Sequence, residues 1–259
     1  MSAAVFGPSQ AGKSFLIGKF ITPPGRPTRV VFEGEALDFL SQVNPQGGKE
    51  TTGLVTRFST TTIETPPGFP VVLRLLREID LVKILVNTFV LDLSGSYESR
   101  EHLSANWVGR LVAEVEPRVE SSPTGGLCME DVLEAREYLE ERLPAHPYVQ
   151  LPEVAEAYWP AMERLLPCLP LKARIRALSP LWGALPELDA LFADLKSALD
   201  QLGHAPVVFA QMDSIRDTSA GVLHVDRIYE LSQTSGPGAQ TVRLALEDGT
   251  QVTLRKSVV

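Results

Sequence analysis

The sequence has few cysteines and no long apolar run, and each shortage excludes a class of protein. Its two cysteines, Cys128 and Cys168, form neither a disulfide framework nor a C-x-x-C pair, which favours core packing in a reducing compartment. No run of about 18 apolar residues is present, and no basic segment followed by an apolar one begins the chain. We therefore expect a cytoplasmic protein with no membrane segment in this chain.

Basic charge is also in short supply. There are 24 Lys and Arg residues against 32 Asp and Glu residues, which gives a net charge of −8. A protein that neutralises many phosphates along a nucleic acid needs the opposite balance, so we expect no nucleic-acid partner. The four histidines lack the spacing of a metal site such as H-E-x-x-H. A single nucleotide needs only a local pocket and is compatible with this composition.

The sequence does contain a phosphate-binding motif near its start. Residues 7–14 match the P-loop (Walker A) pattern G-x-x-x-x-G-K-[ST]. Gly7 and Gly12 permit the tight turn that aims backbone N–H groups at a phosphate. Lys13 is expected on the β- and γ-phosphates and the Ser14 hydroxyl on Mg²⁺. The other residues of the expected nucleotide site are Pro8, Ser9, Gln10 and Ala11.

The surroundings of the motif fit a nucleotide site. An apolar stretch at 3–6 predicts a strand before the loop, and residues 15–20 predict a helix after it. The N-terminal end of that helix would then face the phosphates, where its dipole favours negative charge. We predict a site for GTP or ATP with Mg²⁺.

Hydrolysis needs a further group that completes the Mg²⁺ shell and senses the γ-phosphate. In GTPases this group is a threonine in a mobile loop, and Thr56 follows a polar, Gly-rich loop at 44–53. Thr51 and Thr52 are alternatives in the same loop. Thr56 also suits the simpler role of first residue in a β-branched strand.

An acidic residue after the next strand is expected to hold Mg²⁺ through water. We favour Asp80 over Glu78, and both have an alternative role, because acids stabilise the start of a helix. Asp92 competes with them as the first residue of a D-x-x-G match, which requires a strand at 89–91.

The pattern along the chain predicts an α/β fold: a P-loop NTPase-type sheet with a helical insertion and a C-terminal β-hairpin. The predicted elements are strands at 54–64 and 70–76 that form a hairpin, a buried helix from Glu78, Pro-punctuated helices up to 202, a strand at 205–210, and the terminal hairpin of 241–246 and 251–255. The predicted domains are residues 1–100, the first part of the nucleotide-binding core; 101–203, the helical insertion; and 204–259, the return to the core sheet. We expect the chain to be part of a longer protein, because the P-loop strand begins almost at residue 1.

The base of the nucleotide stays open at this point. Guanine selection in GTPases uses an [NT]-K-x-D sequence after a late strand, and the sequence contains none. The nearest position, at the end of residues 207–213, is Asp213, which either pairs with a base or caps a turn.

Two resemblances add to these patterns. Residues 53–57, Gly-Leu-Val-Thr-Arg, are similar to the Gly-Ile-Val-Thr-Arg stretch of the dynamin superfamily. More of the chain resembles the bacterial virulence-factor family called SrfC. The matching segments are the P-loop, residues 44–58, Asp80-Leu81-Val82-Lys83-Ile84-Leu85, Tyr158-Trp159, Leu181-Trp182-Gly183 and Leu202-Gly203-His204-Ala205.

The dynamin resemblance implies a GTPase, with Thr56 as the switch threonine and Gln10 placed to orient the attacking water. The SrfC resemblance implies that the P-loop part lies at the N-terminus of a larger protein. Our leading interpretation is a Mg²⁺-dependent GTPase or ATPase. The alternative is a non-catalytic interaction module, in which the helical insertion binds a protein partner and the P-loop is vestigial or regulatory.

Overall fold

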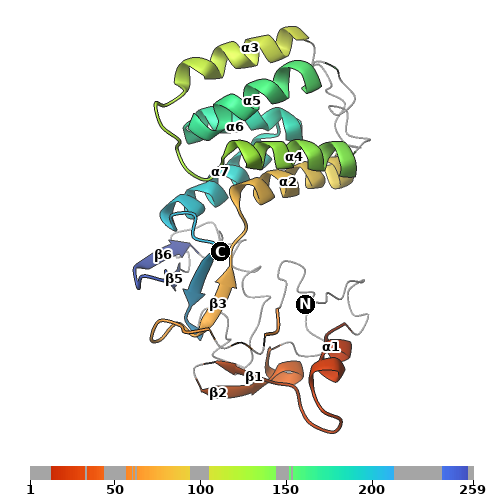
Figure 1. The fold of residues 1–259 in the computed structure, drawn as a ribbon, viewed down its shortest axis with the longest axis vertical. Helices are drawn as coiled ribbons and strands as arrows, with labels where there is room; N and C mark the ends of the chain where they lie inside the picture. The colour runs from red at the N-terminus through yellow and green to blue at the C-terminus, as the bar shows by residue number, and fades with distance from the viewer. Residues whose placement is uncertain are drawn as a thin grey trace. The chain divides into compact units, whose positions relative to one another are not determined.

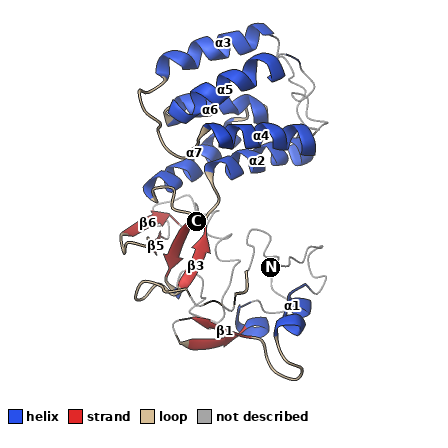
Figure 2. Cartoon of the chain, in the orientation of Figure 1, coloured by secondary structure: helices blue, strands red, loops and turns tan. Residues whose placement is uncertain are grey.

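The computed structural model describes residues 13–32, 34–43, 57–59, 61, 63–93, 105–143, 152, 154–212 and 241–255. Within these residues the fold is mixed α/β, with helices and two small antiparallel sheets (Figures 1 and 2). The chain divides into two compact units. The sheet unit comprises Met1–Arg74 and Val207–Val259, and the helical unit comprises Leu75–Pro206.

The sheet unit begins with α1 (Lys13–Ile21), β1 (Arg29–Phe32) and β2 (Glu35–Asp38), and β1 pairs with β2 in antiparallel register. A π-helical turn at Phe39–Val43 follows. Gly18 lets α1 approach the segment before β1 closely, because a Cβ there would stand 2.9 Å from Thr28 Oγ1. The Thr28 hydroxyl also accepts a hydrogen bond from the Thr22 hydroxyl at 2.9 Å, which fixes the turn after α1.

The second sheet has the strand order β3-β4-β5-β6, and every pairing in it is antiparallel. Its strands are β3 (Val71–Arg74), β4 (Val207–Ala210), β5 (Thr241–Ala245) and β6 (Gln251–Arg255). The predicted C-terminal hairpin is confirmed as β5–β6, with Gly249 at a φ of +84° in its turn.

The predicted hairpin of 54–64 with 70–76 is wrong. β3 pairs instead with β4, and the described residues between 57 and 64 form no strand. Half of residues 57–64 are threonine or serine, and of the two apolar side chains, Phe58 and Ile63, the second is exposed. Strand propensity alone does not hold a segment in a sheet without such burial.

The P-loop NTPase sheet stays a prediction. Such a sheet is largely parallel, whereas all pairings among the described strands are antiparallel. The strand predicted at 3–6 lies outside the described residues. The structure therefore supports the mixed α/β class and not the finer assignment.

The helical unit contains α2 (Glu78–Thr88), α3 (Ala105–Val115), α4 (Met129–Arg142), α5 (Trp159–Leu165), α6 (Leu171–Leu178) and α7 (Pro186–Gln201). Helix α2 packs on α4 and α7, α4 packs on α5, and α6 packs on α3 and α7. In Figure 1 these helices stack in layers, with α3 at one edge of the unit and α2 and α7 at the opposite edge.

The predicted Pro-punctuated helices are confirmed, because Pro160 and Pro186 lie in the first turns of α5 and α7. The largest fully buried side chains of the unit include Trp182, Tyr158, Phe192, Ile79 and Met162. None of the helices among the described residues is long and apolar enough to cross a bilayer.

The helical unit is inserted between two paired strands. Arg74, the last residue of β3, stands opposite Val207, the first residue of β4. One residue further, the Leu75 N–H donates to the Pro206 carbonyl oxygen at 3.1 Å. The chain therefore leaves the sheet and returns to it at neighbouring positions. Residues 75–93, which the sequence placed in the core domain of 1–100, belong by their contacts to the helical unit.

An ion network ties α2 to α4 on the surface of this unit. The Arg77 guanidinium contacts Asp80 at 3.1 Å, Asp131 at 3.3 Å and Glu134 at 2.8 Å, and Lys83 also bonds to Glu134. The hydrogen bonds from Arg77 and then Lys83 lower the pKa of Glu134 to about 2. A carboxylate with a depressed pKa stabilises the folded state only while it is ionised.

We predict that Glu134→Gln lowers the free energy of unfolding by about 0.5–1 kcal/mol at pH 7, because the network is half exposed and screened by solvent. The stabilisation by Glu134 is complete above the unfolded pKa of about 4.3 and is lost as the pH falls toward 2. Urea unfolding at pH 7 and pH 3 measures this. Glu137→Gln, at an exposed position of α4, is the matched control, and an equal effect of both substitutions would contradict the prediction.

Candidate functional site

The structure places Lys13 and Ser14 at the start of α1. The predicted helix at 15–20 is confirmed as α1, described over Lys13–Ile21, so the lysine of the motif lies in this helix. The first turn of α1 contains no acidic residue, and the N–H groups at such an end lack partners within the helix. This end of α1 thus has the polarity that favours an anion.

The remaining residues predicted around the nucleotide are not placed. Gly7, Pro8, Ser9, Gln10, Ala11, Gly12 and Thr56 lie outside the described residues, as do the alternatives Thr51, Thr52 and Asp213. Their roles stay predictions.

Asp80 lies in the first turn of α2 and caps that helix. Its carboxylate accepts hydrogen bonds from the Arg77 backbone N–H at 2.9 Å and from Arg77 Nε and Nη2 at 3.2 and 3.1 Å. The structure therefore shows the helix-start role that the sequence left open. A role in Mg²⁺ binding stays a prediction.

The two competing acids are also placed in the helical unit. Asp92 lies in a π-helical turn at Phe89–Leu93 that continues α2. The strand at 89–91 that the D-x-x-G interpretation requires is absent, so that interpretation is wrong. Glu78 is fully buried at the start of α2.

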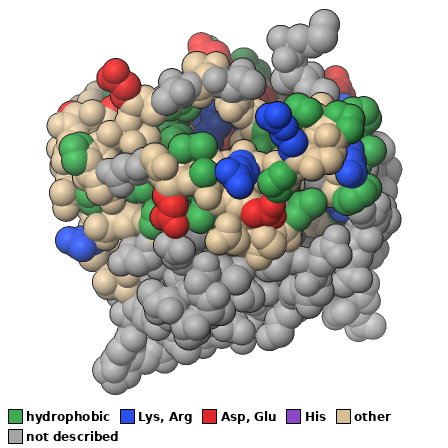
Figure 3. Space-filling model, turned by 90° about the horizontal axis from the view of Figure 1, so that it is seen from below, with side chains coloured by type: hydrophobic (Ala, Val, Ile, Leu, Met, Phe, Trp, Pro, Cys, Tyr) green, Lys and Arg blue, Asp and Glu red, His purple; other side chains and the backbone are tan. Residues whose placement is uncertain are grey.

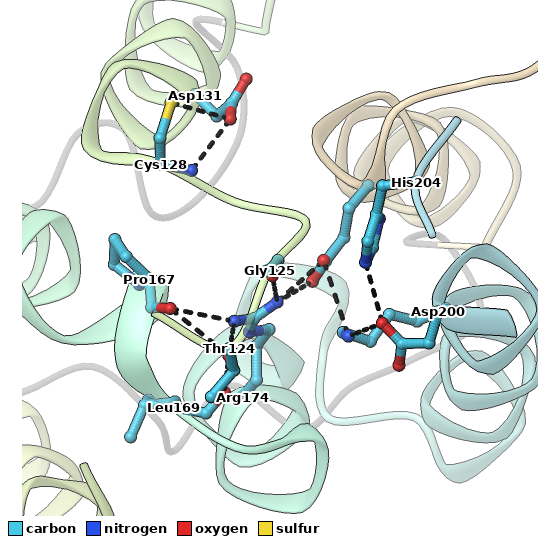
Figure 4. Close-up of polar contacts among 11 residues, drawn as sticks. Thr124, Gly125, Cys128, Asp131, Pro167, Leu169, Arg174, Asp200 and His204 are labelled. Atoms are coloured by element: carbon cyan, nitrogen blue, oxygen red, sulfur yellow. Dashed lines mark hydrogen bonds and ion pairs between the residues drawn. The ribbon is translucent and has the colours of Figure 1, made fainter. Parts of the chain in front are cut away.

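Glu78 belongs to a buried ionic cluster that the sequence analysis missed (Figure 4). Arg174 Nη1 on α6 lies 2.8 Å from both carboxylate oxygens of Glu78, and both side chains have no exposed surface. The Arg174 guanidinium also donates to the Gly125 carbonyl oxygen at 2.9 Å, to the Thr124 hydroxyl and to the Pro167 carbonyl oxygen. One guanidinium therefore joins α2, α6, the segment before α4 and the turn after α5.

Helix α7 completes this cluster. Lys196 is buried, with Nζ 4.0 Å from Glu78 Oε2 and 2.6 Å from Asp200 Oδ1. The same Asp200 oxygen lies 2.8 Å from His204 Nε2. Figure 4 shows the His204 ring and Asp200 turned toward each other at the end of α7.

The contacts of the cluster hold segments of the helical unit together. Burial raises the pKa of Glu78, while the charges of Arg174 and Lys196 act in the opposite direction. Among the polar side-chain atoms of the residues in this cluster, all of them in the described part of the chain, only Arg174 Nε is buried without a hydrogen-bond partner. No group of three or more His, Cys, Asp or Glu within the described ranges is arranged to hold a metal ion.

The sequence did carry a signal for this cluster. Glu78 shares a helix face with the buried Val82 and Leu85. Arg174 likewise shares a face with Ala177 and Leu178, and Lys196 with Phe192 and Leu199. An ionisable residue at an apolar position of each of three helices indicates buried ion pairs, because an unpaired buried charge is too costly.

A hollow in the sheet unit lies along α1 and the segment that follows it. Its lining includes Phe15, Lys19, Arg26 and Asp38. Figure 3 shows one face of the molecule, on which hydrophobic side chains lie among both basic and acidic ones. The buried polar residue of its lining, Thr28, already has its hydroxyl bonded to the Thr22 hydroxyl and to the Gly18 carbonyl oxygen, so we assign the hollow no ligand.

Gly126 and Gly125 provide a matched pair that tests the packing of the cluster. Both have a φ above +80°, so replacement by Ala strains the backbone at either position. A Cβ on Gly126 would also overlap the Glu78 carboxylate, whereas one on Gly125 would stand 3.6 Å from the His204 ring. We predict that Gly125→Ala lowers the free energy of unfolding by about 1–2 kcal/mol and Gly126→Ala by at least about 3 kcal/mol. Urea unfolding measures both values, and similar losses would contradict the geometry.

Comparison with known proteins adds a family and no activity. No curated protein and no solved structure matches the chain. One protein family, described as "Putative bacterial virulence factor", matches residues 1–259. That match confirms the resemblance to a bacterial virulence-factor family and does not test the resemblance to dynamins. The whole of this chain therefore belongs to the bacterial virulence-factor family of that description.

Proposed function

We propose that the chain binds a nucleoside triphosphate, GTP or ATP, together with Mg²⁺ through residues 7–14. The observation that carries the proposal is that Lys13 and Ser14, the last two residues of the G-x-x-x-x-G-K-[ST] motif, lie in helix α1. The motif requires a loop followed by a helix that contains its lysine and its serine, and the helical state of Lys13 and Ser14 supports the proposal on this point.

The charge at this end of α1 supports the proposal. Lys13 brings a cation to the first turn, no acid of that turn opposes a phosphate, and Ser14 follows Lys13 as the motif demands. Bound Mg²⁺ would neutralise the β- and γ-phosphate oxygens, with the Ser14 hydroxyl as its protein ligand within the motif. Lys13 would hold the same phosphates by charge.

Turnover of the nucleotide is the further part of this proposal. Thr56 would complete the Mg²⁺ shell and sense the γ-phosphate, and Gln10 would orient the attacking water. GTP is favoured over ATP only through the resemblance of residues 53–57 to dynamins. The helical unit would respond to the nucleotide or bind a protein partner.

We predict that Lys13→Ala weakens nucleotide binding by at least about tenfold, because it removes a charged contact to phosphate. Calorimetric titration with non-hydrolysable GTP and ATP analogues in Mg²⁺ measures the affinity and identifies the base. Lys19→Ala is the matched control, since it removes the same charge from the last turn of the same helix. Binding to the native chain at about 100 times Kd should also raise the free energy of unfolding by about 2.7 kcal/mol.

Two results would contradict the proposal. One is the absence of binding by the native chain at millimolar nucleotide. The other is equal binding by the native chain and the Lys13→Ala variant. Either result would favour the interaction module, and partners of the helical unit would then be sought with the native chain as bait.

Asp80 has a separate test, because capping and metal binding have different consequences. From the contacts with Arg77 we predict that Asp80→Ala lowers the free energy of unfolding by about 1 kcal/mol and leaves nucleotide affinity unchanged. Urea unfolding and the titration above measure the two quantities. A loss of affinity that appears only in the presence of Mg²⁺ would assign Asp80 to the metal instead.

A further inference from the structure

Two turns in the helical unit have the same unusual backbone. Gly183 and Ala184 have φ values of +72° and +53°, and Gly203 and His204 have φ values of +59° and +55°. In each turn the second residue donates its N–H to a carbonyl five residues earlier. Ala184 N lies 2.8 Å from Ser179 O, and His204 N lies 2.9 Å from Leu199 O. Residues other than glycine rarely adopt this left-handed conformation.

The side chains of the two turns differ. Ala184 is exposed and has only a methyl group, so this backbone does not by itself require a larger side chain. The imidazole of His204 is directed at the ionic cluster, where Nε2 lies 2.8 Å from Asp200 Oδ1. A Cβ built on Gly126 would stand 2.6 Å from the His204 ring and would overlap the Glu78 carboxylate. The ring and the carboxylate therefore both lie against the same glycine.

His204 lies near the point where the chain returns to the sheet. Two residues later the Pro206 carbonyl accepts the hydrogen bond of the Leu75 N–H, at the point where the chain leaves and re-enters the sheet. On the other side, Glu78 begins α2 three residues after Leu75. Leu75 and Pro206, where the chain leaves the sheet and returns to it, are called the two crossings below. Glu78 lies three residues after the first crossing, and His204 two residues before the second.

We propose that His204 holds the chain after α7 against the start of α2 and against Gly125 and Gly126 of the segment between α3 and α4. We call this set of contacts the latch. Its ring fixes the end of α7 through Asp200 and Gly126, and this contact compensates for the left-handed backbone. The latch keeps Leu75 and Pro206, the two ends of the helical unit, next to each other. The proposal does not depend on nucleotide binding.

Amide hydrogen exchange in the full chain tests the latch, with the Leu75 N–H as the reporter of the connection. His204→Gly removes the ring and keeps the left-handed backbone without cost. We expect about tenfold faster exchange at Leu75, with unchanged exchange at Val82 in the buried part of α2. Ala184→Gly is the matched control, because it places the same residue in the same turn away from the crossings, and it should leave Leu75 unchanged.

Two outcomes would overturn the proposal. Unchanged exchange at Leu75 would show that the ring does not hold the crossings together. An equal increase at Val82 would show that His204 only supports the core. His204→Asn, which tolerates the same backbone and lacks the ring, is a second variant with the same expected result. Loss of the folded state in both variants would also assign His204 to the core and overturn the latch.

Discussion

The helical unit depends on the buried ion pair between Arg174 and Glu78. Both side chains are fully buried, so neither charge has access to water and each needs the other. Removal of one partner from such a pair costs about 3–5 kcal/mol, which is a large part of the stability of a domain. The pair joins residues 96 positions apart, and the same guanidinium holds the carbonyl oxygens of Gly125 and Pro167. Ionic contacts at one point therefore join four segments of the helical unit.

The topology explains why the cluster lies where it does. Because Arg74 and Val207 pair directly, the first and last helices of the insertion must begin and end close together. Glu78 stands at the start of α2, and Lys196 and Asp200 stand near the end of α7. Lys196 reaches both Glu78 and Asp200, and these contacts hold the ends of the two helices together. The backbone hydrogen bond from Leu75 to Pro206 and the ionic contacts of Glu78 and Lys196 therefore act on the same two ends of the helical unit.

Local features of this fold could be predicted from the sequence, and contacts between distant segments could not. The start of α2 at Glu78 and the β5–β6 hairpin follow from periodicity and turn residues within each segment. The pairing of β3 with β4 has no local signal, because the whole helical unit, Leu75–Pro206, lies between Arg74 and Val207 in the sequence. Arg174 and Glu78 were visible as charges on apolar helix faces, but only the packed helices show that they are partners.

The same distinction separates the parts of the candidate nucleotide site. A P-loop motif consists of eight consecutive residues, so it can be recognised in the sequence alone. The helical state of Lys13 is compatible with that motif. The other Mg²⁺ ligands come from distant segments, and sequence position does not decide their role. Asp80 follows a strand, as a metal ligand would, yet Arg77 precedes it by three residues and occupies both carboxylate oxygens. An acidic residue after a strand therefore indicates a ligand only when no nearby basic side chain and no helix start already account for it.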